Sequence, residues 1–324
     1  MLFRQTFYLA LALLFITGCS PKTGVVTTQY PAPAASANLA PTASDTTLLW
    51  KITRSGAQPS YLFGTIHLID EDKYFMPERV LSAINGADKV YFEVDMKEME
   101  NPAVIMQMMS KINMRGDTSL SDLLSAEEYE RVESYFSNMG LPFAFFKRMK
   151  PLFLSAMVGQ DMDALKGGGL GGGMTGMKSY EMELNKVAEA NSQPVSGLET
   201  LDFQLSLFDS IPYGGQAKML YEAVVAAENK DAGTEEMNEL DRMTDMYRRQ
   251  AVAEMAQMMS EETEEVSRFE ELLLTKRNRN WVPLIKEALG EESLFYAVGA
   301  GHLGGENGVI ALLRKEGIKV EPVF

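Results

Sequence analysis

The chain has only two histidines among its 324 residues, and both follow the same local pattern. His67 ends the stretch YLFGTIH and His302 ends LFYAVGAGH, so each stands three residues after a glycine, Gly64 or Gly299, that closes an apolar run. Imidazole is a common transition-metal ligand and a general base near neutral pH. The repeated Gly-x-x-His pattern predicts that both histidines serve one site, although a single histidine is more often structural.

Two carboxylates have positions that could complete such a site. Glu93 stands within KVYFEVD, and Glu199 stands near the end of PVSGLET; both stretches are apolar and strand-like. A carboxylate in an apolar strand is costly to bury unless it pairs with a cation or binds a metal. Two imidazoles with one or two carboxylates suit Mn, Co, Fe or Zn, and such an ion can activate water. The other interpretation of Glu93 is a buried ion pair with an arginine such as Arg277.

Strands at both ends of the chain would position these residues, because strand-like runs occupy 48–53, 60–68, 89–95 and 194–200 and recur near the carboxyl terminus. They alternate with helical patterns, which predicts an α/β fold with a mixed β-sheet and a large helical insertion at about 101–190. In such sheets, ligands bind at the carboxyl ends of the strands. Gly64, Gly299 and Gly301 would let the backbone turn or approach closely there.

The first residues indicate export and a lipid anchor. Residues 1–18 have the short positive start and apolar run of a signal peptide, and ITGC places Cys19, the only cysteine, at the position of a lipobox. Ser20 follows Cys19, which favours an outer-membrane lipoprotein facing the periplasm, with outward exposure as the alternative. Residues 19–46 are rich in Pro, Ala, Ser and Thr and predict a flexible linker, and 47–324 form the folded domain.

Composition narrows the function classes. The formal net charge of −15 argues against nucleic acid as a partner, and a single cysteine leaves no pair for a disulfide. The glycine-rich loop at 167–176 lacks the Gly-Lys-Ser/Thr ending and the preceding strand of a phosphate-binding loop. We interpret it as a linker or flap beside the site. The sequence predicts no oligomeric state.

Several motifs together resemble the TraB/GumN (PrgY-like) family. They follow the family's order across about 45–324: YLFGTIHL, YFEVD, PVSGLETLDFQLSLFDSIP, KRNRNW and VGAGHLGGENGVIALLRKEG. The same two Gly-x-x-His motifs and a strand glutamate mark the animal TIKI proteins, which are membrane-tethered metalloproteases. The resemblance also implies a fold of the erythromycin-esterase/ChaN-like superfamily.

Carried over residue by residue, the resemblance implies that His67, His302 and Glu93 hold a divalent metal. Glu199 would be a base or a fourth ligand, and Arg277 and Asn278 would line the site, with Arg277 polarising a carbonyl. The resulting prediction is a metal-dependent hydrolase, a peptidase acting on peptides or amino-terminal segments at the cell envelope. The alternative is a non-catalytic lipoprotein that binds a peptide, haem or a metal.

Overall fold

The computed structural model describes residues 39–324 except 141, 156, 159–175, 230–238 and 261–270. The signal peptide, Cys19 and the first part of the linker lie outside the described residues, and so does nearly all of the glycine-rich loop. Among the helices of the described residues, none combines the length and apolarity needed to cross a membrane.

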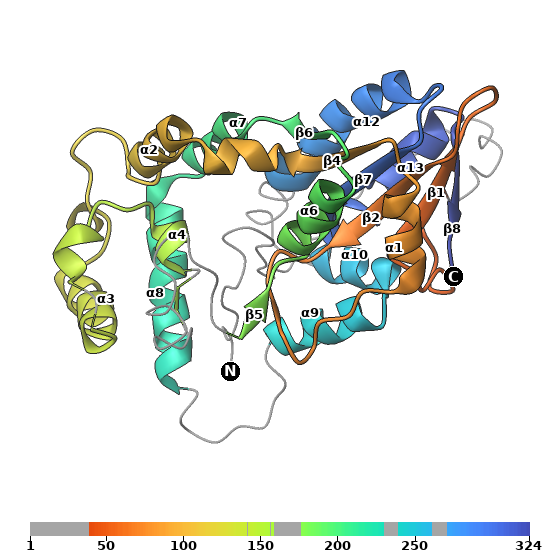
Figure 1. The fold of residues 1–324 in the computed structure, drawn as a ribbon. Coiled ribbons are helices and arrows are strands. Elements are labelled where there is room, and N and C mark those ends of the chain that lie inside the picture. The colour runs from red at the N-terminus through yellow and green to blue at the C-terminus, as the bar shows by residue number, and fades with distance from the viewer. Residues whose placement is uncertain (1–38, 141, 156, 159–175, 230–238, 261–270) are drawn as a thin grey trace, which may run out of the picture.

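A six-stranded sheet forms the centre of the molecule, in the order β6-β4-β7-β2-β1-β8 (Figure 1). The strands are β1 (Leu49–Thr53), β2 (Ser60–Thr65), β4 (Lys89–Val94), β6 (Val195–Glu199), β7 (Leu294–Gly299) and β8 (Lys319–Pro322). Strands β6, β4, β7 and β2 run parallel, whereas β1 is antiparallel to both β2 and β8. The predicted mixed sheet of an α/β fold is confirmed.

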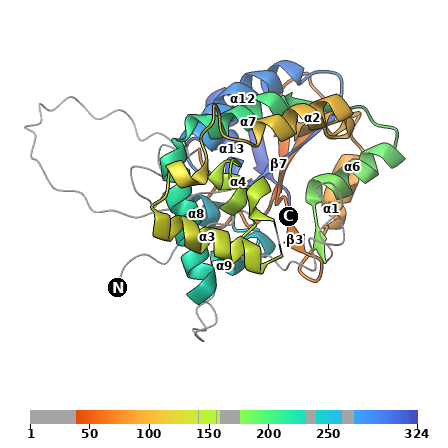
Figure 2. The same ribbon diagram turned by 90° about the vertical axis from the view of Figure 1, so that its left-hand side faces the viewer.

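Helices cover both faces of this sheet. In the two views, α1 and α6 lie on one face and α12 and α13 on the other (Figures 1 and 2). The helices next to the sheet are α1 (Glu78–Asn85), α6 (Tyr180–Ala190), α9 (Glu239–Arg248), α10 (Val252–Ser260), α12 (Lys276–Ala288) and α13 (Val309–Lys315). They share one core with the central strands, in which Phe63, Phe295 and Trp281 are almost fully buried.

A second group of helices extends from the sheet as an arm, at the left of Figure 1. The arm contains α2 (Pro102–Lys111), α3 (Ala126–Asn138), α4 (Pro151–Ser155) and α8 (Tyr213–Asn229) and has a separate apolar core. The short helix α7 (Leu201–Leu207) packs through Leu201 and Leu205 against Val94 at the end of β4.

The limits expected for the helical insertion, about 101–190, differ from this division. Helix α6 lies within those limits, but Tyr180, Leu184 and Ala188 of α6 pack in the core of the sheet. Helix α8 lies beyond them, but its apolar face, with Leu220 and Val224, completes the core of the arm. Because each amphipathic helix buries its apolar face where a partner exists, packing rather than chain order sets the boundary.

Short elements complete the edge where the parallel strands end. They are β3 (Ile69–Asp70), β5 (Met177–Lys178), the 3₁₀ helices η1 (Met96–Glu100) and η8 (Ala300–His302), and the π-helical turn η7 (Glu271–Thr275). Strand β3 pairs antiparallel with β5, so Ile69 lies opposite Lys178. This small sheet holds the segment after His67 against the start of α6.

Candidate active site at the carboxyl edge of the sheet

The predicted site residues stand at one edge of the sheet, because the four parallel strands all end there. Thr65, the last residue of β2, lies opposite Gly299 at the end of β7. Val94, which follows Glu93, lies opposite Glu199 at the end of β6. His67 and His302 follow directly after β2 and β7, so strand register alone brings both histidine segments and both carboxylates to this edge.

The motif glycines allow close approach at this edge. A methyl group built on Gly64 would lie 2.6 Å from Leu303 Cδ1 and 3.1 Å from Ala300 Cα, so only glycine lets η8 pack this closely on β2. A methyl group on Gly299 would lie 3.2 Å from Glu93 Oε1. These glycines make room for the His302 loop and for the carboxylate beside it.

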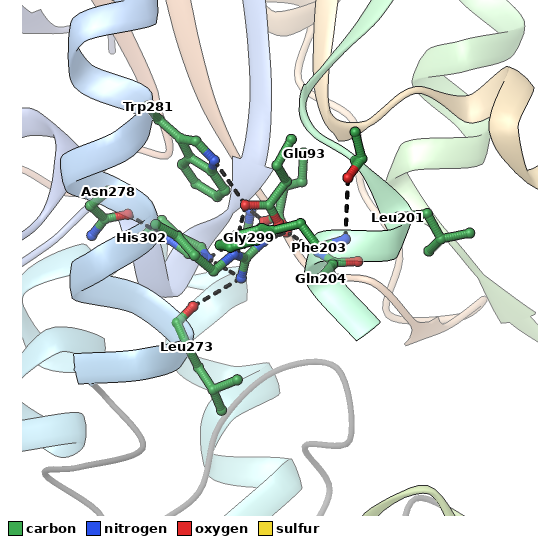
Figure 3. A network of polar contacts seen from close by, with 12 residues as sticks. Glu93, Leu201, Phe203, Gln204, Leu273, Asn278, Trp281, Gly299 and His302 are labelled. Carbon is green, nitrogen blue, oxygen red and sulfur yellow. Dashed lines mark hydrogen bonds and ion pairs between the residues drawn. The ribbon is translucent and has the colours of Figure 1, made fainter. Parts of the chain in front are cut away.

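Glu93 is buried at the centre of the cluster, with its side chain 7% exposed. The backbone N–H of Gly299 donates to its Oε1 at 2.7 Å, and Gln204 of α7 donates to its Oε2 at 3.0 Å. Arg277 of α12 also donates to Oε2. Figure 3 shows Glu93 together with Gly299, Gln204 and His302. The ion pair of Glu93 with Arg277, expected as one interpretation of that carboxylate, is therefore present.

Arg277 joins both carboxylates and His302. Its Nε donates to Glu199 Oε1 at 2.9 Å, and its Nη2 contacts both Glu93 and Glu199. Its Nη1 donates to the carbonyl of Leu273 at 2.9 Å and lies 3.0 Å from His302 Nε2. Trp281 donates to Glu199 Oε2 at 3.1 Å. Every guanidinium nitrogen thus contacts a protein acceptor, so polarising a substrate carbonyl would require Arg277 to release one of these contacts.

The tautomer of His302 follows from its partners. Arginine only donates, so His302 Nε2 accepts from Arg277 and carries no proton. The Nδ2 of Asn278 donates to the carbonyl of Asn307 at 2.9 Å, which leaves Asn278 Oδ1 to accept from His302 Nδ1 at 2.6 Å. His302 is neutral: burial and the positive charge of Arg277 lower its pKa to about 3.

His67 has the opposite electrostatic setting. Its Nδ1 lies 2.9 Å from Glu181 Oε1, and its side chain is 25% exposed. Burial alone would lower the pKa of His67, but the charge and hydrogen bond of Glu181 raise it to about 9. The charges of Glu93 and Arg277 also act on this pKa, so the ring lies within electrostatic range of the cluster.

The pKa values of the two carboxylates, Glu93 and Glu199, are also shifted in opposite directions. Burial would raise the pKa of Glu93, but the charge of Arg277, the two histidines and the N–H of Gly299 together outweigh burial and hold that pKa well below its usual range. Burial raises the pKa of Glu199, against the opposing effect of Arg277. Glu93 is thus the firmly ionised member of the pair, and Glu199 is the carboxylate with greater affinity for a proton.

The donor types fit a divalent metal ion. Both histidines place Nδ1 on a protein partner, the arrangement that usually leaves Nε2 as the ligand atom. His302 Nε2 lies 3.7 Å from Glu93 Oε1, a separation that two ligands of one ion, each at about 2.1 Å, can span. Arg277 holds contacts to both donors, however, and within the described ranges no three His, Cys, Asp or Glu side chains are grouped as ligands. Arg277 therefore competes with an ion for these donors.

The structure places the predicted residues in two linked groups. Glu93, Glu199, Arg277, Asn278 and His302 form one hydrogen-bonded network, and His67 lies beside it with Glu181. The residues that sequence reasoning did not assign to the site are Thr65, Glu181, Gln204 and Trp281. Gln204 and Trp281 stand within the family motifs, so their motif membership was an available signal. Glu181 stands in an ordinary helical pattern, and no motif singles it out.

A cavity of about 480 Å³ opens on the Asn278 side of the cluster. Much of its wall is small or polar, and includes Thr275, Asn278, Gly301, Gly304, Gly305 and Glu306. Because glycine side chains occupy no space, the loop after His302 leaves room for a ligand next to the network.

An α/β protein with a buried charged cluster at the carboxyl edge of its parallel strands has the architecture of a ligand-binding or catalytic domain. The chain belongs to the TraB/PrgY/gumN family, whose sequence model matches residues 48–322. The resemblance seen in the motifs is therefore confirmed. No solved structure matches the chain.

Curated relatives include animal proteases and bacterial proteins. Metalloprotease TIKI1 of Danio rerio is 23% identical over 322 residues, which cover 84% of this chain and 62% of that protein. Metalloprotease TIKI2 of Xenopus tropicalis is 23% identical over 361 residues, covering 96% of this chain and 66% of the relative. The uncharacterized protein YbaP of Escherichia coli (strain K12) is 25% identical over 166 residues, which cover 51% of this chain and 58% of that protein. The chain thus spans less than two thirds of the length of these relatives.

Proposed function

We propose that this protein is a peptide hydrolase that requires a divalent metal ion. The observation that carries the proposal is the buried network of Glu93, Glu199, Arg277 and His302 at the carboxyl edge of the sheet, with His67 beside it. The metalloprotease names of several relatives support this reaction class. His67, His302 and Glu93 would hold the ion, which when bound would supply a Lewis acid and a water with a lowered pKa. Mn, Co, Fe and Zn all suit these donors.

The side chains around that ion would divide the remaining work. Glu199, whose pKa burial raises, is the carboxylate suited to take a proton from water and pass it to a leaving amine. Gly299 and Gln204 hold the Glu93 carboxylate in place through both of its oxygens. Arg277, once released from one contact, has N–H groups suited to a developing oxyanion.

The cavity beside Asn278 supports a peptide as substrate. Its volume of about 480 Å³ is in the range of small-molecule sites, and the glycines in its wall leave room for a peptide backbone to approach. We propose that the cavity holds residues next to the cleaved bond, as it would for a short peptide or an amino-terminal segment.

We also propose that the domain works at the bacterial envelope, anchored to the outer membrane by lipid on Cys19 and facing the periplasm. The support is the signal-peptide pattern of residues 1–18 and the position of the single cysteine. Radiolabelled palmitate should label the full-length protein, and Cys19→Ser should lose the label. Equal labelling of both proteins would contradict the anchor.

Metal content and peptide cleavage together test the proposed reaction. The detergent-solubilised full chain, wild type, His67→Ala and His302→Ala would be analysed for bound metal and for cleavage of a mixed peptide library by mass spectrometry. We expect a stoichiometric ion in the wild type, lost in each variant, with cleavage reduced at least about 100-fold. Glu321→Gln on the exposed face of β8 is a control that should change neither. Folded wild type that takes up no ion and cleaves no peptide would overturn the proposal.

A non-catalytic binder is the second candidate, and one observation favours it. All guanidinium nitrogens of Arg277 already pair with protein acceptors, so the network is complete without a substrate. A peptide binder would retain its ligand after Glu199→Gln and would show no cleavage in the wild type. A hydrolase would lose turnover in the same variant.

A further inference from the structure

The Nδ1 side of His67 is held by a buried carboxylate that the proposed chemistry leaves unused. Glu181 Oε1 lies 2.9 Å from His67 Nδ1, and the Glu181 side chain is only 13% exposed. Thr65 Oγ1 donates to the same oxygen at 2.6 Å, and Ser179 Oγ donates to the other at 3.1 Å. Both carboxylate oxygens are thus held, and the position of Glu181 is fixed relative to the end of β2.

Strands β3 and β5 and the start of α6 hold Glu181 next to His67. Strands β3 and β5 pair two residues after His67 and just before α6, with Ile69 opposite Lys178. Ser179 caps α6 by accepting from the N–H of Met182, which places Glu181 in the first turn. The small sheet therefore brings the start of α6 to His67 and keeps it there.

Helix stabilisation does not account for the burial of Glu181. Acidic residues favour the first turn of a helix, and Glu183 occupies that turn as well. Glu183 pairs with Lys186 on the surface, however, whereas Glu181 is turned inward and contacts His67. Burying a carboxylate is costly unless its partners compensate, so the position serves the histidine rather than the helix.

The two histidines are held alike but by different groups. His302 places Nδ1 on the neutral amide of Asn278, and His67 places Nδ1 on the charged carboxylate of Glu181. In both rings Nε2 is therefore the nitrogen that this partner does not hold. Among the described residues, no hydrogen bond involves His67 Nε2, whereas His302 Nε2 contacts Arg277.

We propose that Glu181 is a positioning residue of the site, which fixes the ring of His67 through Nδ1 and presents Nε2 to the metal ion. This inference rests on the proposed function for the identity of that ligand. It assigns Glu181 no contact with the substrate. Thr65 and Ser179 support the carboxylate by holding its two oxygens.

Nuclear magnetic resonance tests the positioning without metal or substrate. In protein labelled with ¹⁵N-histidine and freed of metal, only two imidazoles contribute signals, and His302→Asn identifies which belongs to His67. We expect Glu181→Gln to shift the Nδ1 and Nε2 signals of His67 and to leave those of His302 in place. Glu183→Gln, which removes a carboxylate from the same helical turn, should shift neither. Unchanged His67 signals in Glu181→Gln would overturn the inference.

Cobalt binding tests the consequence for the site. Titration of the full chain with Co²⁺, followed by its visible absorption, should show 10- to 100-fold weaker binding in Glu181→Gln, as is usual when the group orienting a ligating histidine is removed. Glu183→Gln should bind within about twofold of the wild type. Equal affinity in Glu181→Gln and wild type would overturn the inference and leave the proposed function standing.

Two further outcomes remain distinguishable. If the wild type binds no Co²⁺, Mn²⁺, Fe²⁺ or Zn²⁺, the metal in the proposed function is wrong, and the resonance experiment alone decides whether Glu181 positions His67. If Glu181→Gln does not fold, Thr65→Val replaces it, because this variant removes one donor to Glu181 and keeps the charge. We then expect the same shifts in smaller size, and their absence would overturn the inference.

Discussion

Arg277 balances the charge of the buried cluster. It is 6% exposed and pairs with two carboxylates that are themselves almost fully buried. Burial would lower the pKa of Arg277, but Glu93 and Glu199 together raise it. Removing one partner from such a group leaves uncompensated charge in a poorly solvated place, which is more costly than the intact pair is favourable.

Replacing Arg277 with methionine should therefore destabilise the protein strongly. We expect Arg277→Met to lower the free energy of unfolding by about 3–5 kcal/mol, measured by urea denaturation at pH 7. The control is Arg279→Met on the same helix, since Arg279 pairs with Glu271 at the surface. This substitution should lower the free energy of unfolding by less than about 1 kcal/mol. Similar losses in both variants would show that the cluster is not the source of the effect.

The effect of Arg277→Met should also depend on pH. The pKa of Glu93 is lowered in the folded protein from an ordinary value of 4.5, so the folded state binds fewer protons than the unfolded state over that interval. The stability that Arg277 contributes through Glu93 is fully present above pH 4.5 and is lost as the pH falls further. We expect the difference between wild type and variant to narrow in acid, and a constant difference would contradict this.

The two histidines should titrate in opposite directions from their ordinary value of 6.5. In metal-free protein, one imidazole should titrate near pH 9 and the other should stay neutral down to about pH 3, as measured by proton resonances. The stability due to His67 is present below pH 6.5 and is lost as the pH rises through about 9. The stability due to neutral His302 is present above pH 6.5 and is lost as the pH falls toward 3. Two titrations near 6.5 would contradict the described contacts.

Individual residues were predictable where a strand end or a motif marked them. His67, Glu93, Glu199 and His302 follow from strand ends and register, because parallel strands bring their carboxyl ends together. Glu181 could not be found in this way, since its contact depends on the pairing of β3 with β5, each two residues long. Such short pairing has no periodic sequence pattern.

At the scale of elements, the close packing of η8 on β2 determines how near the His302 segment lies to the end of β2. Gly64 Cα faces Ala300 and Leu303, and no larger residue fits without displacing them. Strands β2 and β7 hold the two histidine segments side by side, so widening this contact would separate them. The glycine of the first Gly-x-x-His pattern thus serves packing.

Gly64→Ala should cost about 1–3 kcal/mol of stability through overpacking. The added methyl group would lie 2.6 Å from Leu303 Cδ1, so Gly64→Ala should cost less stability in a Leu303→Ala background than in the wild type. Thermal or urea unfolding of the two single variants and the double variant measures the interaction free energy between positions 64 and 303. Gly214→Ala is the control, because nothing lies within 4 Å of a methyl group there and alanine favours helix α8. Purely additive effects of Gly64→Ala and Leu303→Ala would contradict direct contact.

At the scale of the whole molecule, two large apolar cores account for most of the buried apolar side chains in the described part of the chain. The sheet and its flanking helices share one core, and α2, α3, α4 and α8 share the other. The sequence predicted that helices would be inserted into the sheet domain. The sequence could not show that α8 packs in the core of the arm. An amphipathic pattern predicts that one face of a helix is buried, but it does not indicate which element packs against that face.

The arm should open as its own unit. Leu220 of α8 is fully buried in the core of the arm, so Leu220→Ala should cost about 2–5 kcal/mol there. We expect hydrogen exchange, followed by mass spectrometry, to quicken in α3 and α8 and to stay slow in β4 and β7. Leu284→Ala on the exposed side of α12 should leave exchange unchanged in both regions. Uniform acceleration across the sheet in Leu220→Ala would show that the two cores unfold together.

The sheet combines strands from both ends of the folded chain, since β1 pairs with β8 and β2 pairs with β7. In a polypeptide still emerging from a ribosome, His67 is present long before His302. Pairings between such distant segments form slowly and late. Until residues 294–322 have arrived, β2 has no parallel neighbour and Glu93 lacks the N–H of Gly299. A nascent or truncated chain therefore carries no assembled cluster at this edge, and the cluster forms only after synthesis is complete.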